Sequence, residues 1–384
     1  MAAEKLLVRT SQVLPLRPLG FTGLRASVLG LGGCGLGDIY GEIRESDAVD
    51  TVLRSLELGV TMIDTSPNYG NGKSEQRIGT ALTCFRGTVG QTESGTTERL
   101  TLVTKCGDAG PQNDGHSPFS KEGVFASFKR SQALLSPGKV GVLLLHDPTL
   151  KELDEFFHPG TGGVEAFKEL KQSGEVDATG VGVREHDVLF RFMTNPSNVA
   201  DVVLPVNDWN LLRRYASVNI LPLANKLGIC VLNGGPLYMG LLSGICPQES
   251  FSQGSLKSGI EVPELVSLAG HMREWCNANE VDLRGLALRF AMGMWKVDAP
   301  GSDELEISYG IRSPQGFSPP IAAALVGAKS ASEIEETVQS VVVALEEEDM
   351  YQRKAVEFEQ AFGLAVGALA DDAHWYYSKD AVDL

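Results

Sequence analysis

The chain of 384 residues alternates short apolar runs with stretches in which apolar residues recur at helical spacing. The runs are rich in Val, Leu, Ile and Ala, which is typical of strands buried on both faces of a parallel sheet. Strands that alternate with helices indicate βα units. Eight candidate strands follow: Val28 to Leu31, Thr61 to Asp64, Leu100 to Lys105, Val140 to His146, Ala178 to Val183, Asp201 to Val206, Gly228 to Leu232 and Ala322 to Val326. The pattern predicts an α/β fold, a (β/α)8 barrel, although the length also allows two ordinary domains.

Helical segments fit between the runs. In Ala48 to Leu58 the apolar residues recur every three or four positions, Ser46 can cap the start, and Gly59 can end the helix in a left-handed turn. Glu165 to Gln172 and Leu283 to Met294 have similar patterns. We expect such helices to pack on the outer face of the barrel.

The two ends of the predicted barrel have their own signals. A late helix is marked by the apolar residues Ile334, Val338, Val341 and Leu345. We expect Ser332 and Glu335 to form its capping box. Near the N-terminus, RPLG and LRAS flank a Gly-containing turn and predict a hairpin. We therefore expect an N-terminal extension over residues 1–15 and a single barrel domain over residues 16–384.

Three stretches rich in Gly, Ser, Thr or Pro interrupt the regular pattern and are interpreted as loop insertions: Arg86 to Glu98, Asp108 to Ser120 and Lys296 to Pro320. The second follows Lys105 directly, so we expect it to rise over the end of the barrel that carries the chemistry. The final residues, DDAHWYYSKDAVDL, are expected to pack their aromatic side chains on the barrel, with an active-site lid as the alternative.

Composition narrows the class of protein. Lys and Arg number 33 against 49 Asp and Glu, a formal net charge of −16 that opposes binding to nucleic acid. No apolar run approaches the roughly 20 residues needed to span a bilayer, so a soluble protein is expected. The cysteines are too scattered for a zinc site or a disulfide scaffold: Cys34, Cys84, Cys106, Cys230, Cys246 and Cys276. These features favour the cytoplasm, with an organelle presequence as the alternative. The sequence leaves the oligomeric state open.

Four ionisable side chains stand at or just beyond the ends of three successive runs: Asp64, Tyr69, Lys105 and His146. The C-terminal ends of the strands are where a (β/α) barrel gathers its reactive groups, so this arrangement predicts an enzyme.

These residues lie in motifs that resemble a known family. The segments LGLGGCGLG, IDTSPNYGNGKSEQRIGTAL, LVTKCG, LLLHDP, GVGVREHD, GGPLYMGLLSG and LVGAKSASEIEETV are similar to those of aldo-keto reductases, and most similar to the branch of L-galactose and D-arabinose 1-dehydrogenases. The resemblance implies a TIM barrel that binds an extended nicotinamide cofactor without a Rossmann domain or a metal. The glycines of LGLGGCG are then a strand-end turn rather than a dinucleotide fingerprint.

The residue types suit hydride transfer, in which a proton must move to or from the substrate oxygen. Tyr69 is the candidate for this proton transfer, and we expect Lys105 to lower its pKa by favouring the phenolate. Asp64 would hold Lys105, and His146 would donate a hydrogen bond to the substrate oxygen.

The resemblance also implies a set of cofactor contacts, although Val183 and Arg184 replace a Ser-Asn pair that is common in the family. The expected contacts are Gly33, Cys34, Asp64, Val183, Arg184, Pro236, Leu237, Met239, Leu241, Gly327, Lys329, Ser330 and Glu333. Glu333 occupies the position where NADP-binding members usually have a basic residue, which predicts NAD, with NADP as the alternative. Tyr69, His146 and Trp209 are expected to contact the substrate, with a packed strand end as the other interpretation of Trp209.

The resulting hypothesis is NAD-dependent oxidation of an aldose at C1 to its lactone, with a small sugar as the only expected partner. Two alternatives stay open. One is an NADPH-dependent aldehyde or carbonyl reductase. The other is a non-catalytic cofactor-binding subunit, like the β subunits of potassium channels.

Overall fold

The structure is a computed structural model that describes residues 14–89, 100–108, 114–217, 220–245, 263–295 and 321–370. Eight parallel strands close into a barrel in the order β10-β3-β4-β5-β6-β7-β8-β9. The strands are β3 (Leu29–Gly32), β4 (Met62–Asp64), β5 (Thr101–Cys106), β6 (Val140–His146), β7 (Ala178–Val183), β8 (Val202–Pro205), β9 (Cys230–Gly234) and β10 (Ile321–Gly327). The predicted (β/α)8 fold is confirmed, and the bounds of each predicted strand move by at most two residues.

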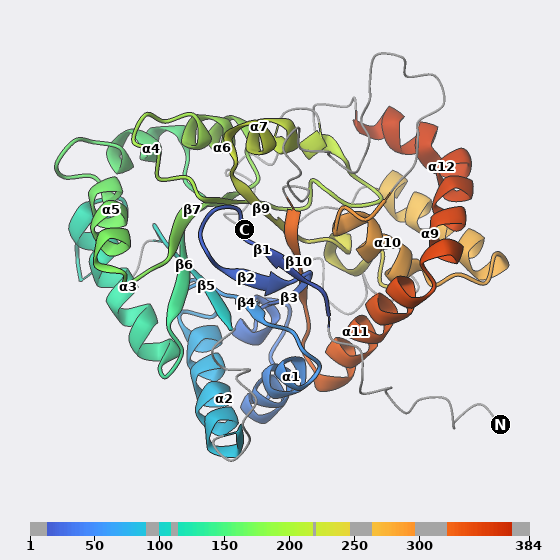
Figure 1. The fold of residues 1–384 in the computed structure, drawn as a ribbon, viewed down its shortest axis with the longest axis horizontal. Coiled ribbons are helices and arrows are strands. Elements are labelled where there is room, and N and C mark those ends of the chain that lie inside the picture. Colours follow the sequence, from blue (N-terminus) through green and yellow to red (C-terminus); the bar gives the residue numbers. More distant parts are fainter. Residues whose placement is uncertain are drawn as a thin grey trace.

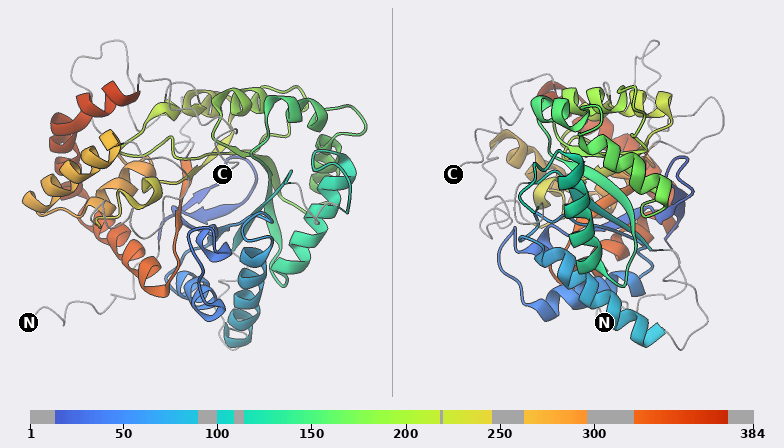
Figure 2. Two further views of the ribbon diagram at one scale, coloured as in Figure 1. Left: turned by 180° about the vertical axis from the view of Figure 1, so that it is seen from behind. Right: turned by 90° about the vertical axis from the view of Figure 1, so that its left-hand side faces the viewer.

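The helices surround this barrel (Figure 1, Figure 2). They are α1 (Glu45–Glu57), α2 (Lys73–Val89), α3 (Lys121–Leu135), α4 (Leu150–Phe156), α5 (Gly163–Ser173), α6 (His186–Met193), α7 (Ile220–Leu227), α9 (Pro263–Ala278), α10 (Leu283–Ala291), α11 (Ala331–Glu346) and α12 (Glu348–Ala370). Within the described ranges, no helix is long and apolar enough to cross a membrane.

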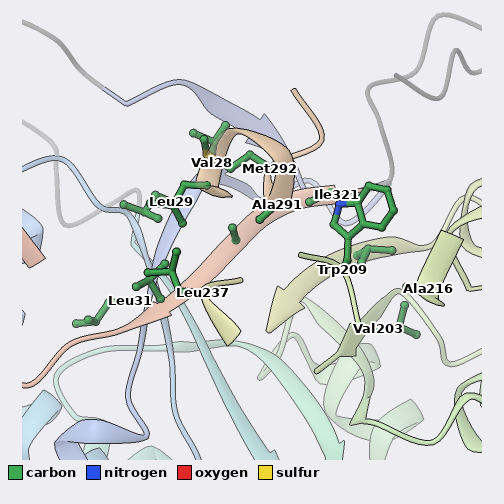
Figure 3. Packing of buried hydrophobic residues seen from close by; sticks show 14 of the residues in the cluster. Val28, Leu29, Leu31, Val203, Trp209, Ala216, Leu237, Ala291, Met292 and Ile321 are labelled. Atoms are coloured by element: carbon green, nitrogen blue, oxygen red, sulfur yellow. The ribbon is translucent and has the colours of Figure 1, made fainter. Parts of the chain in front are cut away.

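Two buried clusters explain why the strands are almost continuously apolar. One fills the barrel interior and includes Met62, Val103 and Leu144. The other lies between the strands and the helices, and Figure 3 shows part of it, including Leu29 of β3 and Ile321 of β10. Burying one such side chain stabilises the fold by about 1.5–3 kcal/mol. Apolar residues on both faces of each strand therefore hold the strand ends, and the polar groups on them, in fixed positions.

The predicted N-terminal hairpin is present and closes the N-terminal end of the barrel. Its strands β1 (Leu16–Pro18) and β2 (Arg25–Ser27) pair antiparallel, and Leu19 is buried in the interior cluster. The Arg17 guanidinium donates a hydrogen bond of 2.9 Å to the carbonyl oxygen of Ile321, where β10 begins. The opposite, C-terminal end is left for chemistry.

Two predicted helix starts are wrong. Helix α1 begins at Glu45, and its N-cap residue is Arg44, which makes no side-chain capping bond, so Ser46 does not cap it. The predicted end is confirmed, because Gly59 has the left-handed φ of 83° that favours glycine.

The start of α11 also differs from the prediction. Its N-cap is Ser330, whose hydroxyl accepts the Glu333 N–H at 3.2 Å. The predicted pair of Ser332 and Glu335 is wrong because the chain turns into the helix immediately after β10. Glu335 instead accepts a hydrogen bond of 2.8 Å from Arg54 of α1.

Parts of the predicted loops fall on described residues. Arg86 to Val89 belong to α2, so the first loop begins later than expected. Asp114 to Ser120 of the second loop form turns and a bridge before α3. The remainder of the first loop, residues 109–113 of the second, the third loop from Lys296 to Pro320, and the C-terminal residues 371–384 lie outside the described residues, as does most of the N-terminal extension.

Candidate active site

The four predicted ionisable residues meet at the C-terminal end of the barrel. Asp64 is the last residue of β4, Lys105 lies one residue before the end of β5, and His146 is the last residue of β6. These three strands are neighbours in the barrel. Tyr69 lies in the turn between β4 and α2. The register of the parallel strands therefore brings together residues that are up to 82 positions apart along the chain.

Lys105 is the centre of this group. Its Nζ donates hydrogen bonds to Asp64 Oδ1 at 2.8 Å, to Asp64 Oδ2 at 2.9 Å and to the carbonyl oxygen of Thr65 at 2.8 Å. It also lies 3.2 Å from the Tyr69 hydroxyl. Burial raises the pKa of Asp64, although the charge of Lys105 acts in the opposite direction. The ammonium group is thus fixed between a carboxylate and the phenol.

The turn that carries Tyr69 is held by close backbone packing. The Tyr69 N–H donates to Ser66 at 3.1 Å, and the Ser74 N–H donates to the Tyr69 carbonyl at 3.2 Å. Gly70 has a φ of 66°, and a Cβ there would lie 2.3 Å from the carbonyl oxygen of Gly37. Only glycine fits this position, because the loop after β3 packs directly on the turn.

The prediction that Lys105 lowers the pKa of Tyr69 is wrong. Burial raises the pKa of Tyr69 well above the ordinary tyrosine value, and the negative charge of Asp64 adds to the increase. Lys105 lies beside the phenol, but burial of the phenol and the negative charge of Asp64 set the direction of the shift. In this structure Tyr69 is therefore a neutral phenol at physiological pH.

His146 is oriented by groups that the sequence did not single out. Its Nδ1 lies 2.9 Å from Asp108 Oδ2 and 3.2 Å from the Ser66 hydroxyl. A carboxylate can only accept, so Nδ1 carries the proton that bonds to Asp108. The rings of His146 and Tyr69 meet edge to face, with centroids 5.8 Å apart. The remaining ring nitrogen, Nε2, is left for a substrate.

The electrostatics of His146 also depend on Asp108. Burial alone would lower the pKa of His146, but the hydrogen bond to Asp108 and the charge of Asp147 outweigh it, so the net pKa is raised. The sequence signal for Asp108 is its place three residues after Lys105, just past the end of β5. Without the fold, this residue looked like the first residue of a loop.

Apart from Asp64 of β4, the predicted cofactor residues lie at or just after the C-terminal ends of four other strands. Gly33 and Cys34 follow β3, Val183 ends β7 and Arg184 follows it, Pro236, Leu237, Met239 and Leu241 follow β9, and Gly327, Lys329, Ser330 and Glu333 connect β10 to α11. All of them lie at the end of the barrel that carries the four ionisable residues. Leu237 and Leu241 are buried in the cluster between strands and helices, and Figure 3 shows Leu237 there.

The segment before α11 is tied to the loop after β3. The Lys329 side chain packs over Gly35, and its Nζ lies 3.5 Å from the carbonyl oxygen of Tyr40. The exposed Glu333 carboxylate accepts the Lys329 N–H at 2.8 Å. A helix N-terminus in this position suits an anionic group.

Two residues after β8, Trp209 and Asn207, differ in their surroundings. Trp209 stacks on Phe290 of α10, with ring centroids 4.6 Å apart, and is 3% exposed, which supports the interpretation of Trp209 as a packed strand end. Asn207 has a φ of 58°, and its buried Oδ1 has no hydrogen-bond partner in the structure. An unpaired buried acceptor at the end of a barrel strand fits the polar edge of a bound cofactor.

Comparison with known proteins gives the family. The sequence profile of the Aldo/keto reductase family matches residues 28–357. The chain is 29% identical to L-galactose dehydrogenase from Arabidopsis thaliana over 90% of its length and 93% of that protein. It is 25% identical to D-threo-aldose 1-dehydrogenase from a Pseudomonas species, over 70% of this chain and 83% of that protein. The solved glycerol dehydrogenase AKR11B4 from Gluconobacter oxydans has the same fold, with a TM-score of 0.62, 19% identity and coverage of 94% and 98%.

The chain belongs to the aldo/keto reductase family. It is an NAD(P)-dependent oxidoreductase with a TIM barrel fold.

Proposed function

We propose that the protein oxidises an aldose at C1 to its lactone with NAD, and that L-galactose or D-arabinose is the type of sugar it takes. The observation that supports hydride-transfer chemistry most directly is the hydrogen-bonded group of Asp64, Lys105 and Tyr69 beside His146. Both relatives described above are named for dehydrogenation of an aldose.

The roles follow from the contacts. Tyr69 takes the proton of the C1 hydroxyl, and His146 Nε2 positions the same oxygen. Lys105, 3.2 Å from the Tyr69 oxygen, stabilises the phenolate that accepts this proton. Asp64 fixes Lys105 through two hydrogen bonds. A nicotinamide cofactor bound at the residues proposed above would supply the acceptor for the hydride of C1, and loss of one hydride and one proton would convert the lactol to the lactone.

The raised pKa of Tyr69 predicts that the rates of oxidation and reduction depend differently on pH. Oxidation needs the phenolate as the base, and the phenol dominates at neutral pH. Oxidative turnover should therefore rise as the pH is raised toward the alkaline range. Reduction needs the phenol as the acid, so it should show no such increase.

The preference for NAD is proposed from the start of α11. The residues that would hold the adenosine end are Lys329, Ser330 and Glu333. The Glu333 carboxylate would repel a 2′-phosphate and can accept a hydrogen bond from a 2′-hydroxyl. Lys329 acts against this preference, because its ammonium group could contact a phosphate.

A second candidate function is reduction of an aldehyde or carbonyl with NADPH. The neutral Tyr69 phenol beside His146 favours it, because this pair can donate a proton to a carbonyl oxygen. The groups of the tetrad are the same in both reactions, and only the direction and the substrate differ.

One experiment separates the two candidates. The purified protein is assayed for NADH formation with a panel of free aldoses and, in parallel, for NADPH consumption with a panel of simple aldehydes. We expect NADH formation with at least one aldose, and its loss in Tyr69→Phe. Turnover of aldehydes without turnover of any aldose would replace the first proposal with the second.

A further inference from the structure

Asp147, the residue after His146, lies beside the reactive groups, and its charge helps to raise the pKa of His146. Its N–H donates a hydrogen bond of 2.9 Å to the carbonyl oxygen of Gly182, which ties its backbone to β7. Its side chain is 60% exposed, whereas that of His146 is only 10% exposed. The carboxylate thus stands at the open side of the buried catalytic group.

The backbone of Asp147 is unusual. Its φ of 40° lies in the left-handed region, which disfavours most residues other than glycine, although Asp and Asn tolerate it. This conformation brings Oδ2 of Asp147 to 3.8 Å from Nε2 of His146. That distance is too long for a direct hydrogen bond. The carboxylate therefore flanks the nitrogen that is left for the substrate without bonding to it.

The negative charge of the Asp147 carboxylate does not favour transfer of the substrate proton to Tyr69. Asp108 already binds Nδ1 of His146, so Asp147 is not needed to orient the ring. Burial raises the pKa of Tyr69 and the charge of Asp147 adds to the increase, which places this carboxylate within electrostatic reach of the phenol. A negative charge here opposes negative charge on the reacting oxygen. It is suited instead to accept a hydrogen bond from a neighbouring group of the substrate.

We propose that Asp147 is a specificity-determining residue that accepts a hydrogen bond from the hydroxyl on the carbon next to the reacting carbon. The ligand class is then an α-hydroxy aldehyde or its lactol, and a substrate with a carboxylate in place of that carbon is rejected by charge. This inference rests on the proposed function in one respect, namely that Tyr69 and His146 bind the reacting oxygen. A hydroxyl on the adjacent carbon lies close enough to that oxygen to reach the carboxylate.

The test compares two aldehydes that differ by a single hydroxyl, lactaldehyde and propanal, as substrates for reduction. Asp147→Gly removes the carboxylate and keeps the left-handed backbone without strain. We expect the KM for lactaldehyde to rise about ten- to a hundredfold in this variant, as for loss of a hydrogen bond to a charged group. The KM for propanal should change by less than about twofold. Asp147→Asn, a neutral acceptor, should fall between the two proteins.

A third substrate tests the role of charge. In glyoxylate a carboxylate is bonded directly to the aldehyde carbon and replaces the hydroxyl-bearing carbon, so the native protein should reduce it poorly and Asp147→Gly should reduce it better. The matched control is Asn198→Gly. Asn198 has a similar φ of 52° and is exposed, but it lies before β8 at the opposite end of the barrel. This control should leave all three substrates unchanged.

The results can also overturn the proposal. An equal loss with lactaldehyde and propanal in Asp147→Gly would show that Asp147 positions His146 and does not bind a hydroxyl. Failure with every aldose while aldehydes are reduced would reject the proposed function and leave this comparison intact. If no substrate is turned over, calorimetric binding of propane-1,2-diol and propan-1-ol to the NADH-loaded protein replaces kinetics. Equal affinity for the two alcohols in the native protein would reject the role of Asp147.

Discussion

The ends of β4 to β6 and the start of α11 carry charged side chains at the same end of the barrel, yet the charges are held differently. The side chains of Lys105 and Asp64 are 2% and 7% exposed and contact each other through two short hydrogen bonds. Glu333 is exposed, and its carboxylate accepts the Lys329 N–H. Charges removed from water interact far more strongly with their neighbours than charges at the surface. Removal of any charged residue at the ends of β4 to β6 should therefore disturb the remaining ones. A change of charge at Glu333, by contrast, should have little effect on the fold.

The comparison predicts that the largest loss of activity comes from the buried region. Tyr69→Phe keeps the aromatic ring beside His146 and removes the hydroxyl that contacts Lys105. We expect kcat to fall by about two to four orders of magnitude, as for other general acid–base groups. The Kd of the nicotinamide cofactor, measured by fluorescence titration, should change little, because Tyr69 is not one of the proposed cofactor contacts. Steady-state kinetics in both directions measure the effect.

A control distinguishes loss of the reactive hydroxyl from loss of any buried hydroxyl. Tyr351 is also buried but lies on α12, outside the ends of β4, β5 and β6. Tyr351→Phe should retain native turnover. Near-normal turnover in Tyr69→Phe would remove this residue from the mechanism, and the contrast between the two regions would lose its main support.

The buried region was also the easier one to predict from the sequence. A strand buried on both faces leaves a continuous apolar run, and an ionisable residue at its end is conspicuous, as with His146 after VGVLLL. The sequence therefore located eight strands and the four ionisable residues at their ends. It could not give the pKa of Tyr69, because burial of a phenol depends on the loop after β3 that packs over it.

Other features could not be predicted from the sequence, because they depend on contacts between segments that are distant along the chain. Asp108 orients His146 from the segment just past the end of β5, and no spacing along the chain shows that pair. At the start of α11, two overlapping Ser-x-x-Glu patterns begin at Ser330 and Ser332. The end of β10 decides between them and selects Ser330. Long amphipathic helices without a strong local boundary, such as α12, were not identified either.

The second prediction concerns the stability of the buried pair. Lys105→Met leaves the Asp64 carboxylate buried without its cation, which should lower the free energy of unfolding by about 3–5 kcal/mol at pH 8. Burial raises the pKa of Asp64 in the folded protein, and loss of Lys105 removes the charge that opposes this increase. The folded variant therefore binds a proton more readily than the unfolded chain, so its deficit relative to the native protein should shrink as the pH falls from 8 to 5.

Urea denaturation of both proteins across this pH range measures the deficit. The control is the double variant Asp64→Asn with Lys105→Met, which has no carboxylate to protonate. Its deficit should be nearly constant over the same range. A deficit of Lys105→Met that is also independent of pH would show that Asp64 is not the group left uncompensated.

The smallest effect is expected at the exposed region and concerns the choice of cofactor. Glu333→Arg replaces a carboxylate that would repel a 2′-phosphate by a cation that would bind it. The ratio of kcat/KM for NAD to that for NADP should fall by about three- to tenfold, as expected of a screened surface charge. Glu333→Gln keeps an acceptor for the Lys329 N–H and removes the charge, so it should shift the ratio by less. Stability should stay near the native value in both variants, since Ser330 still caps α11. An unchanged ratio in Glu333→Arg would show that this residue only caps the helix, and Lys329 would then be the next residue to test for contact with the adenosine end.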